Sequence, residues 1–217
     1  MKRNYKKRLC YVFYFLNEIW NLPRIIAQTK ESQTPVYFCM WFMQRIVGIN
    51  RKAYWPTHFT SNIGEVENIY AGIDTSPGYS PGCYIQGGGK TYIGDYTQIG
   101  PNVGIISANH SLTKIKEVDV GAVKIGKYCW IGMNSVILPN VELGNFTIVG
   151  AGSIVTKSFP DGFCVIGGNP AKVLKTLDKS LCIQGQNSFE YNGYIPSDKF
   201  EIYRKRFNIY GSINGVF

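Results

Sequence analysis

The chain has 217 residues and a formal net charge of +9, from 23 Lys and Arg against 14 Asp and Glu. This length is enough for one domain with flanking helices. The charge is concentrated at the amino terminus, where residues 1–55 hold 10 Lys and Arg against 2 Asp and Glu, a net of +8. No nucleic-acid-binding motif accompanies these charges, so nucleic acid is not an expected partner. The six cysteines form no CxxC pair or other metal-binding spacing, which predicts reduced thiols and a cytoplasmic protein.

Residues 1–56 are predicted to form two or three amphipathic helices. They begin with the basic run KRNYKKR and contain two apolar runs, LCYVFYFL and VYFCMWFM. Both runs are too short to span a bilayer, and no small-residue cleavage site follows the first. Two roles stay open, and one helix could fill both. The helices could pack against the open end of the following domain, or present a basic, aromatic face to anionic lipid at the inner face of the membrane.

A six-residue repeat occupies residues 93–155. Nine aliphatic residues follow it in two runs: Ile93, Ile99 and Ile105, then Ile125, Ile131, Ile137, Leu143, Val149 and Val155. A helix repeats about every 3.6 residues and a strand about every 2, so a period of six indicates short strands joined by turns. Three such strands make one coil of a prism, and only stacked coils bury a core. We therefore expect residues 18 apart to stack, as Ile131 on Val149, Ile137 on Val155 and Ile125 on Leu143.

Two further features refine this prism. A Gly follows six of the nine aliphatic residues, which suits a corner where the backbone has a positive φ or another segment approaches closely. Ile63 and Ile69 extend the pattern upstream, with the Gly- and Pro-rich stretch 75–90 as a distorted coil. An ordinary sandwich of short strands is the alternative, but fixed spacing without hairpin turns argues against it.

The register breaks between Ile105 and Ile125, which are twenty residues apart rather than eighteen. His110 stands at this break, just before an excursion at residues 111–122. A histidine accepts a proton near neutral pH, its unperturbed pKa being about 6.5. A lone His is more often a surface or capping residue, but its place at the interruption favours a function. His58, before the first coil, is either an acceptor-site candidate or a structural residue, and two histidines cannot supply a three-His zinc site, so no metal is expected.

Several strings resemble one known family, the hexapeptide-repeat acyltransferases, and in particular its sugar O-acetyltransferases of the galactoside, maltose, nodulation and capsule groups. The strings are GPNVGIISANH, IGKYCWIGMNSVILPNVELG, VGAGSIVTKSFP and GGNPAKVLK, within about Pro77 to Leu177. The segments PTHFTSNIG and NIYAGIDTSPGYSPGCYIQG resemble the capsule and lipopolysaccharide branch. The resemblance implies a mainly β, left-handed parallel β-helix at 57–172, after a helical region 1–56 and before a C-terminal helix and tail at 173–217. It also implies a homotrimer with active sites in the clefts between prisms.

The resemblance further implies an acetyl-CoA-dependent O-acetyltransferase that acts on a sugar hydroxyl in surface polysaccharide synthesis. His110 matches the family's catalytic base. Gln86 falls near a family Asn that contacts the acceptor or intermediate, and His58 and Asn109 are further acceptor or oxyanion candidates. In the excursion, Glu117 or Asp119 could contact sugar hydroxyls, although a solvated loop is an equal alternative.

The same resemblance assigns a set of coenzyme residues. Trp130 matches an aromatic of the pantetheine cleft, although it could simply pack on the coil. Ala151 and Gly152 would let the pantetheine arm approach the backbone. The remaining candidates lie near the nucleotide and phosphates, and for the three lysines a solvated face is the alternative: Thr156, Lys157, Lys172 and Lys175. Asn169 and Pro170 are expected to end the last coil and lead into a short helix.

Other activities remain open within this fold. The acceptor could instead be an amino-sugar nitrogen, serine or an antibiotic, and the prism could be a non-catalytic scaffold. The tail at 178–217 could cap the prism or add basic charge near the coenzyme.

Overall fold

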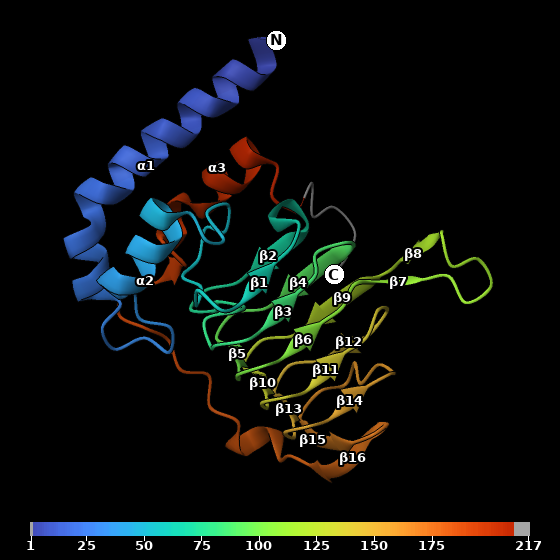
Figure 1. Ribbon diagram of the computed structural model, residues 1–217. Coiled ribbons are helices and arrows are strands. Elements are labelled where there is room, and N and C mark those ends of the chain that lie inside the picture. Colours follow the sequence, from blue (N-terminus) through green and yellow to red (C-terminus); the bar gives the residue numbers. More distant parts are fainter. Residues whose placement is uncertain (1, 211–217) are drawn as a thin grey trace.

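Short parallel strands wind into a three-sided prism at the centre of the computed structural model, which describes residues 2–210 and the side chains from residue 13 onward (Figure 1). We call its three sides face A, face B and face C. Face A contains β1 (Asn62–Ile63), β3 (Tyr84–Ile85), β6 (Gly104–Ile105), β11 (Val136–Ile137) and β14 (Ile154–Val155). Face B contains β2 (Ile69–Ala71), β4 (Lys90–Ile93), β9 (Ala122–Ile125) and β12 (Glu142–Leu143). Face C contains β5 (Gln98–Ile99), β10 (Trp130–Ile131), β13 (Thr147–Val149), β15 (Cys164–Gly168) and β16 (Ala171–Thr176).

The predicted stacking of residues 18 apart is confirmed. Ile131 pairs with Val149, Ile137 with Val155 and Ile125 with Leu143, each between parallel strands. These side chains fill the inside of the prism, where most of the repeat's aliphatic residues have no exposed surface. Burying each such side chain contributes roughly 1.5–3 kcal/mol, so the stack is the main source of stability of this part of the chain.

Glycine is needed at these corners because the backbone of the next coil approaches closely, and not because φ is positive there. A Cβ on Gly126 would lie 2.6 Å from the backbone nitrogen of Asn145, and one on Gly132 would lie 2.6 Å from that of Ala151. The positive φ falls two residues later, on asparagines and aromatic residues such as Tyr128. Asparagine tolerates this left-handed conformation better than most residues, which accounts for Asn at several corners but not for the aromatic ones.

The fourth position after each aliphatic residue also points inward. Thr97, Ser135 and Thr147 are buried there, with hydroxyls that donate to backbone carbonyls of the corners. Cys129 occupies an equivalent place, and its burial raises the pKa of the thiol to about 11. This position therefore closes the corners with short hydrogen-bonding side chains.

The excursion is longer than its spacing suggested. Residues stacked across it are 32 positions apart, as Ile105 with Ile137, where 18 is the rule, so it inserts 14 residues. Ile125 does not lie one coil beyond Ile105, because the two residues lie on adjacent faces of the same coil. The insert forms an antiparallel hairpin of β7 (Ala108–His110) and β8 (Val118–Val120), which projects from the prism and which we call the arm (Figure 1).

Helices gather at the end of the prism that holds β1 and β2 (Figure 1). They are α1 (Lys2–Gln28), α2 (Phe38–Phe42), the π-helical turn η1 (Met43–Val47), the 3₁₀ turn η2 (Val66–Asn68) and α3 (Ser197–Phe207). Aromatic side chains of α3 cover the open end, with the Phe200 ring 5.1 Å from that of Tyr54. Tyr14 of α1 packs in turn on Tyr203 and Phe207 at 5.1 and 5.3 Å between ring centroids. The amino-terminal helices thus share the covering of this end with α3.

A buried polar network joins α1 to α2 and η1. The Glu18 carboxylate accepts hydrogen bonds from the indole of Trp41 at 2.6 Å and from Nε of Arg45 at 2.8 Å. Arg45 also donates to the carbonyl of Ala53 at 2.9 Å. Gln44 of η1 bonds three backbone carbonyls and accepts from the hydroxyl of Tyr194 at 2.8 Å. Removing one partner of such a buried pair is costly, so the network holds these helices in place.

The short helix expected after Pro170 is wrong, because β16 forms there instead. It pairs antiparallel with β15 and so supplies hydrogen-bond partners to the last strand of face C. An unpaired strand edge is unfavourable, which favours a hairpin over a helix at this point. After the 3₁₀ turn η3 (Lys179–Leu181), the chain returns along the prism to the helical end and forms β17 (Tyr191–Asn192) and β18 (Ile195–Pro196) (Figure 1).

The returning segment follows a ladder of aromatic rings at the corner between faces B and C. Tyr96, Tyr128, Phe146 and Phe163 stack in succession at 5.0–5.2 Å between centroids. The Tyr128 hydroxyl donates to the carbonyl of Gly185 at 3.1 Å, and that of Tyr96 donates to Glu190 at 2.8 Å. The tail, whose role the sequence left undecided, is thereby fixed along this corner.

Among the described residues, none of the helices combines the length and apolar character needed to cross a membrane.

Candidate active site

His110 lies at the end of β7, opposite Val118 of β8. Its Nδ1 is 3.0 Å from the backbone carbonyl oxygen of Ile115, on the turn of the arm. Because a carbonyl oxygen only accepts, this hydrogen bond assigns the ring proton to Nδ1 and leaves the lone pair on Nε2. The residue is exposed. The arm therefore presents a histidine in the tautomer that a general base requires.

Gln86 contacts the point where the arm leaves the prism, at Ser107 and Ala108, which we call the root of the arm. It follows β3, and its side-chain oxygen accepts from the backbone nitrogens of Ser107 and Ala108 at 2.9 and 2.7 Å. Ser107 directly precedes β7 and Ala108 begins it, so Gln86 fixes the start of the strand that ends in His110. Its amide NH2 group has no hydrogen bond within the part of the chain that the structure describes. It remains able to donate to a ligand.

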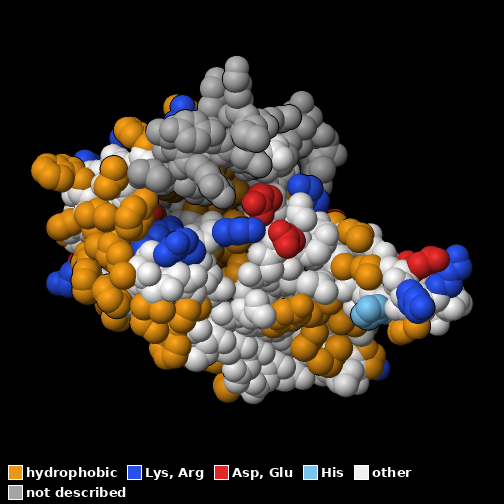
Figure 2. Space-filling view, turned by 45° about the horizontal axis from the view of Figure 1, so that its top comes forward, with side chains coloured by type: hydrophobic (Ala, Val, Ile, Leu, Met, Phe, Trp, Pro, Cys, Tyr) orange, Lys and Arg blue, Asp and Glu red, His pale blue; other side chains and the backbone are white. Residues whose placement is uncertain are grey.

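The rest of the arm is exposed. Asn109 pairs with Asp119 across the hairpin, and because side chains alternate along a strand, Asn109 and His110 lie on opposite faces of it. Glu117 forms an ion pair with Lys114 at 3.1 Å near the tip. Figure 2 shows the arm standing away from the body, with charged side chains gathered toward its tip.

His58 lies elsewhere. It precedes β1, at the corner where face A begins, whereas the arm leaves from the corner where face A ends. Its Nδ1 accepts from the backbone nitrogen of Thr60 at 3.2 Å, and its ring stacks on Phe59 at 4.4 Å. No contact among the described residues joins His58 to the arm. The structure thus does not bring the two histidines together within one chain.

The coenzyme candidates fall into three places on the prism. Ala151 and Gly152 form the corner between faces C and A, where Gly152 has a φ of +70° and its nitrogen donates to the carbonyl of Met133 at 2.8 Å. No heavy atom lies within 4 Å of the position of a Cβ on Gly152, so its backbone is open to approach. Thr156 and Lys157 follow β14 at the corner between faces A and B, which is also the corner of the arm.

Trp130 and Lys175 lie on the outer surface of face C. Strand pairing aligns one row of residues across this face: Gln98, Trp130, Ile148, Val165 and Lys175. Trp130 is 56% exposed, which disfavours a role in packing the coil. Lys172 lies opposite Gly167 in the same hairpin and is exposed. One chain therefore divides the predicted site between face C and the two corners that border face A.

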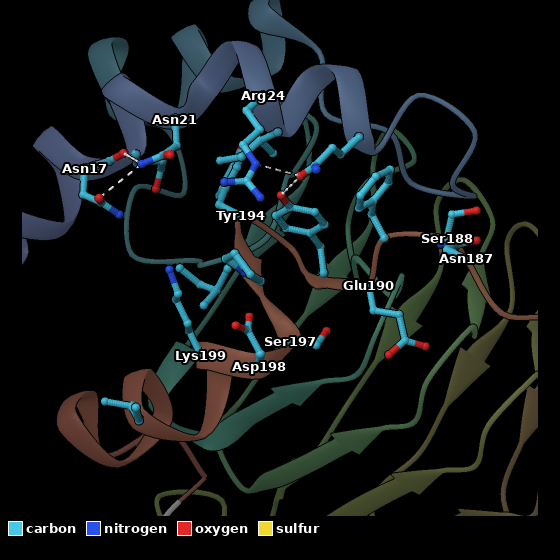
Figure 3. A pocket seen from close by; sticks show the side chains of 18 of the residues that line it. Asn17, Asn21, Arg24, Asn187, Ser188, Glu190, Tyr194, Ser197, Asp198 and Lys199 are labelled. Carbon is cyan, nitrogen blue, oxygen red and sulfur yellow. Dashed lines mark hydrogen bonds between the residues drawn. The ribbon is translucent and has the colours of Figure 1, made fainter.

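A separate groove of about 830 Å³ lies between α1 and α3. Figure 3 shows Asn17, Asn21 and Arg24 of α1 across from Ser197, Asp198 and Lys199 of α3. None of the residues predicted for the active site lines this groove. The sequence did not predict it, because it depends on how the two ends of the chain meet.

One part of the candidate site has no signature in the sequence. The group that orients His110 is the backbone carbonyl of Ile115, which any residue could supply. No group of three or more His, Cys, Asp or Glu side chains in the described part of the chain is placed to bind a metal ion.

Comparison with known proteins gives one family model and a set of similar structures. Residues 122–157 match the model described as bacterial transferase hexapeptide (six repeats). A galactoside acetyltransferase in complex with coenzyme A is 23% identical, covers 79% of this chain and 90% of its own, and superposes with a TM-score of 0.57. A maltose O-acetyltransferase from Clostridium difficile 630 is 23% identical over 76% of this chain and 89% of its own, with a TM-score of 0.46. A hexapeptide-repeat acetyltransferase from Vibrio cholerae O1 biovar eltor, complexed with acetyl coenzyme A, is 24% identical over 63% of this chain and 78% of its own, with a TM-score of 0.49.

No curated protein sequence matches the chain. The matched repeats coincide with the coils β9 to β14, and the superposition on the galactoside acetyltransferase covers 79% of the chain. The chain thus contains the hexapeptide repeats of bacterial transferases and has the left-handed parallel β-helix fold.

Proposed function

We propose that this protein transfers an acetyl group from acetyl-CoA to a hydroxyl group of a sugar, with His110 as the general base. The observation that carries the proposal is the hydrogen bond from Nδ1 of His110 to the Ile115 carbonyl at 3.0 Å, which leaves Nε2 free to accept a proton. The hexapeptide repeats and the shared fold support the reaction class.

The proposed reaction uses this geometry. Nε2 of His110 takes the proton of the acceptor hydroxyl as its oxygen attacks the thioester carbonyl carbon. The bond between that carbon and sulfur then breaks, and the proton passes from His110 to the departing thiolate. General base catalysis of this kind contributes typically 10²- to 10⁴-fold to the rate. The free NH2 group of Gln86, beside the root of the arm, is a candidate donor to the acceptor or to the oxyanion.

The coenzyme is proposed to lie against the remaining candidates. The open backbone at Ala151 and Gly152 would allow the pantetheine arm to approach closely, beside Trp130. Thr156, Lys157, Lys172 and Lys175 would contact the nucleotide and its phosphates, for which a lysine serves as a flexible point charge. No other cofactor or metal takes part in this proposal.

These residues cannot all face one ligand within a single chain, because Trp130 and Lys175 lie on face C and His110 lies at the far corner of face A. A homotrimer would bring face C of one copy toward the arm of the next. Exposed aliphatic side chains on the arm support this arrangement, because a cluster of apolar side chains in solvent is typical of a surface that another protein covers. These side chains are Leu112, Ile115, Val118 and Val120.

The acceptor is proposed to be a sugar, as the name of the galactoside acetyltransferase states for that protein. The resemblance of residues 56–87 to the capsule and lipopolysaccharide branch points further to a glycan of surface polysaccharide synthesis. A cytoplasmic site of action fits this role, because acetyl-CoA and nucleotide-linked or lipid-linked glycans meet there.

The test measures thiol release from acetyl-CoA with a panel of acceptors: free sugars, nucleotide sugars, polysaccharide repeat units, lipid-linked glycans, amino sugars and serine. We expect release with one glycan class only. The variant His110→Ala should abolish release while it still binds acetyl-CoA, and Lys116→Ala, on the same arm, should retain full activity.

Other results would overturn parts of the proposal. Release with serine or an amino sugar alone would change the acceptor class, and unchanged release by His110→Ala would remove His110 as the base. A protein that binds no acetyl-CoA would be a scaffold with this fold.

A further inference from the structure

The outer surface of α1 is apolar although it faces solvent. Phe13, Leu16, Ile19 and Trp20 are exposed by 64, 59, 41 and 87%. Their spacing of three and four places Phe13, Leu16 and Trp20 on one side of the helix. The opposite side is already packed, because Leu22 and Ile25 belong to a buried cluster with Val36, Trp41, Tyr191 and Tyr194. The packing that the sequence predicted for this helix therefore uses only one of its two apolar sides.

The neighbouring segment exposes the same kind of surface. Phe38, Phe42 and Ile46 follow one another at intervals of four along α2 and η1 and are 60, 41 and 45% exposed. The rings of Phe38 and Phe42 are 6.2 Å apart. Figure 2 shows hydrophobic side chains gathered on the side of the molecule where α1 and α2 lie. We call this set of seven residues the apolar helical face: Phe13, Leu16, Ile19, Trp20, Phe38, Phe42 and Ile46.

Basic residues accompany the apolar helical face. Arg24, Lys30, Arg51 and Lys52 are exposed in the same region. Between residues 13 and 55 the acidic residues are Glu31, which is exposed, and Glu18, which is paired with Arg45 at 2.8 Å. Arg24 also lines the groove that contains Glu190 and Asp198. Residues 1–55 as a whole carry a net +8, whereas the other 162 residues hold 13 Lys and Arg against 12 Asp and Glu, a net of +1.

This positive charge distinguishes between two partners that could cover the apolar helical face, a second copy of the chain and a lipid bilayer. A second copy of the chain would place two regions of net +8 against each other, and like charges oppose such contact. An anionic bilayer attracts each basic side chain near its surface and receives Trp and Phe side chains at its interface. Since none of the described helices is suited to span a bilayer, the helix would lie in the interface plane.

We propose that the apolar helical face docks this protein on the surface of an anionic lipid bilayer. Phe13, Leu16 and Trp20 of α1 and Phe38 and Phe42 of α2 enter the interface, and the surrounding Lys and Arg side chains contact the lipid headgroups. This inference goes beyond acyl transfer and does not depend on it.

The test is sedimentation of the full-length protein with vesicles of phosphatidylcholine, alone or mixed with an equal part of phosphatidylglycerol. We expect binding to the mixed vesicles at low salt, with much weaker binding to phosphatidylcholine and at high salt. The double variant Phe13→Ser with Trp20→Ser should weaken binding to the mixed vesicles by roughly a hundredfold, because each buried aromatic contributes on the order of one factor of ten. Leu181→Ser removes a 77% exposed side chain from η3, at the other end of the prism, and should bind like the parent protein (Figure 1).

Three results would overturn the proposal. They are an absence of sedimentation with anionic vesicles at every salt concentration, equal binding by the double variant and the parent, and a concentration-dependent self-association that the double variant abolishes. Circular dichroism and thermal unfolding of the variants should match those of the parent protein, because the substitutions are at exposed positions. Thiol release from acetyl-CoA with a soluble acceptor should be equal in all three proteins, so the docking and transferase proposals can fail separately.

Discussion

The coiled body and the arm contain the same kinds of aliphatic residue but place them in opposite environments. In the body, Ile105, Ile131 and Leu143 have no exposed surface, whereas in the arm Leu112 is fully exposed and Ile115 is 73% exposed. Stacked coils complete each other's core within one chain. The tip of the arm has no such neighbour among the described residues. Under the proposed function, the body carries stability and the arm carries the catalytic base and a contact with another copy. Each substitution below tests one side of this division.

The largest expected effect is that of His110→Ala on turnover. Loss of the base should lower kcat by about 10²- to 10⁴-fold, whereas the free energy of unfolding should change by less than about 0.5 kcal/mol because the residue is exposed. Steady-state thiol release and urea unfolding measure the two quantities. A large loss of stability with a proportional loss of activity would contradict the separation of roles.

Ile131→Ala should have the converse effect. It removes a fully buried side chain between Ile99 and Val149, and such substitutions cost about 2–5 kcal/mol. Urea unfolding measures the loss, and Ile183→Ala, at a position 85% exposed, is the matched control with less than about 0.5 kcal/mol. Equal stability of the two variants would show that the coils do not carry the core.

Gln86→Ala tests the connection between the coiled body and the arm. It leaves the buried nitrogens of Ser107 and Ala108 without their acceptor, which costs about 1–3 kcal/mol, and releases the root of the arm. We expect a lower kcat with an unchanged affinity for acetyl-CoA. Gln184→Ala, at an exposed position of the returning segment, should be silent, and a Gln86→Ala protein with full kcat would mean that the arm needs no such support.

The double variant Leu112→Ser with Ile115→Ser tests whether another copy covers the arm. The stability of the single chain should change by less than about 0.5 kcal/mol, since these side chains contact solvent. Light scattering should show the parent as a trimer and the variant as a weaker assembly with reduced activity. A monomeric parent protein would rule out a site shared between copies.

The smallest effect concerns the thiol of Cys129, which should resist alkylation in the folded protein while the exposed Cys39 reacts. Burial raises the Cys129 pKa to about 11, so the folded state keeps its proton where an unfolded chain would lose it. The contribution of this thiol to stability is complete below the ordinary thiol pKa and declines as the pH rises toward about 11. Mass spectrometry of alkylated peptides, and the pH dependence of unfolding in Cys129→Ala, measure the two effects. Rapid native labelling of Cys129 would place it outside the core.

The fold could largely be predicted from the repeat, because a six-residue period is a local pattern that leaves one stacking register. Ile131 on Val149 and Ile137 on Val155 followed from counting alone. The length of the insertion did not, because a spacing of twenty residues resembles one coil, and only the pairing of Ile105 with Ile137 reveals the arm. The helix expected after Pro170 was wrong because local signals do not show that β15 would be left with an unpaired edge.

The sequence by itself determined the prism and its inward residues, since both depend on periodicity. The interruption of that periodicity gave His110 as the candidate base, which stays a prediction. Only the tertiary structure decided the orientation of that histidine, because its partner is a backbone carbonyl brought near by the hairpin turn. It also decided that the corner glycines serve close approach, and that Trp130 and His110 lie on different parts of the prism. The physical reason is that the repeat encodes which side chains stack inside the prism. It encodes neither the backbone path at a corner nor the conformation of the inserted hairpin, and these decide the contacts named here.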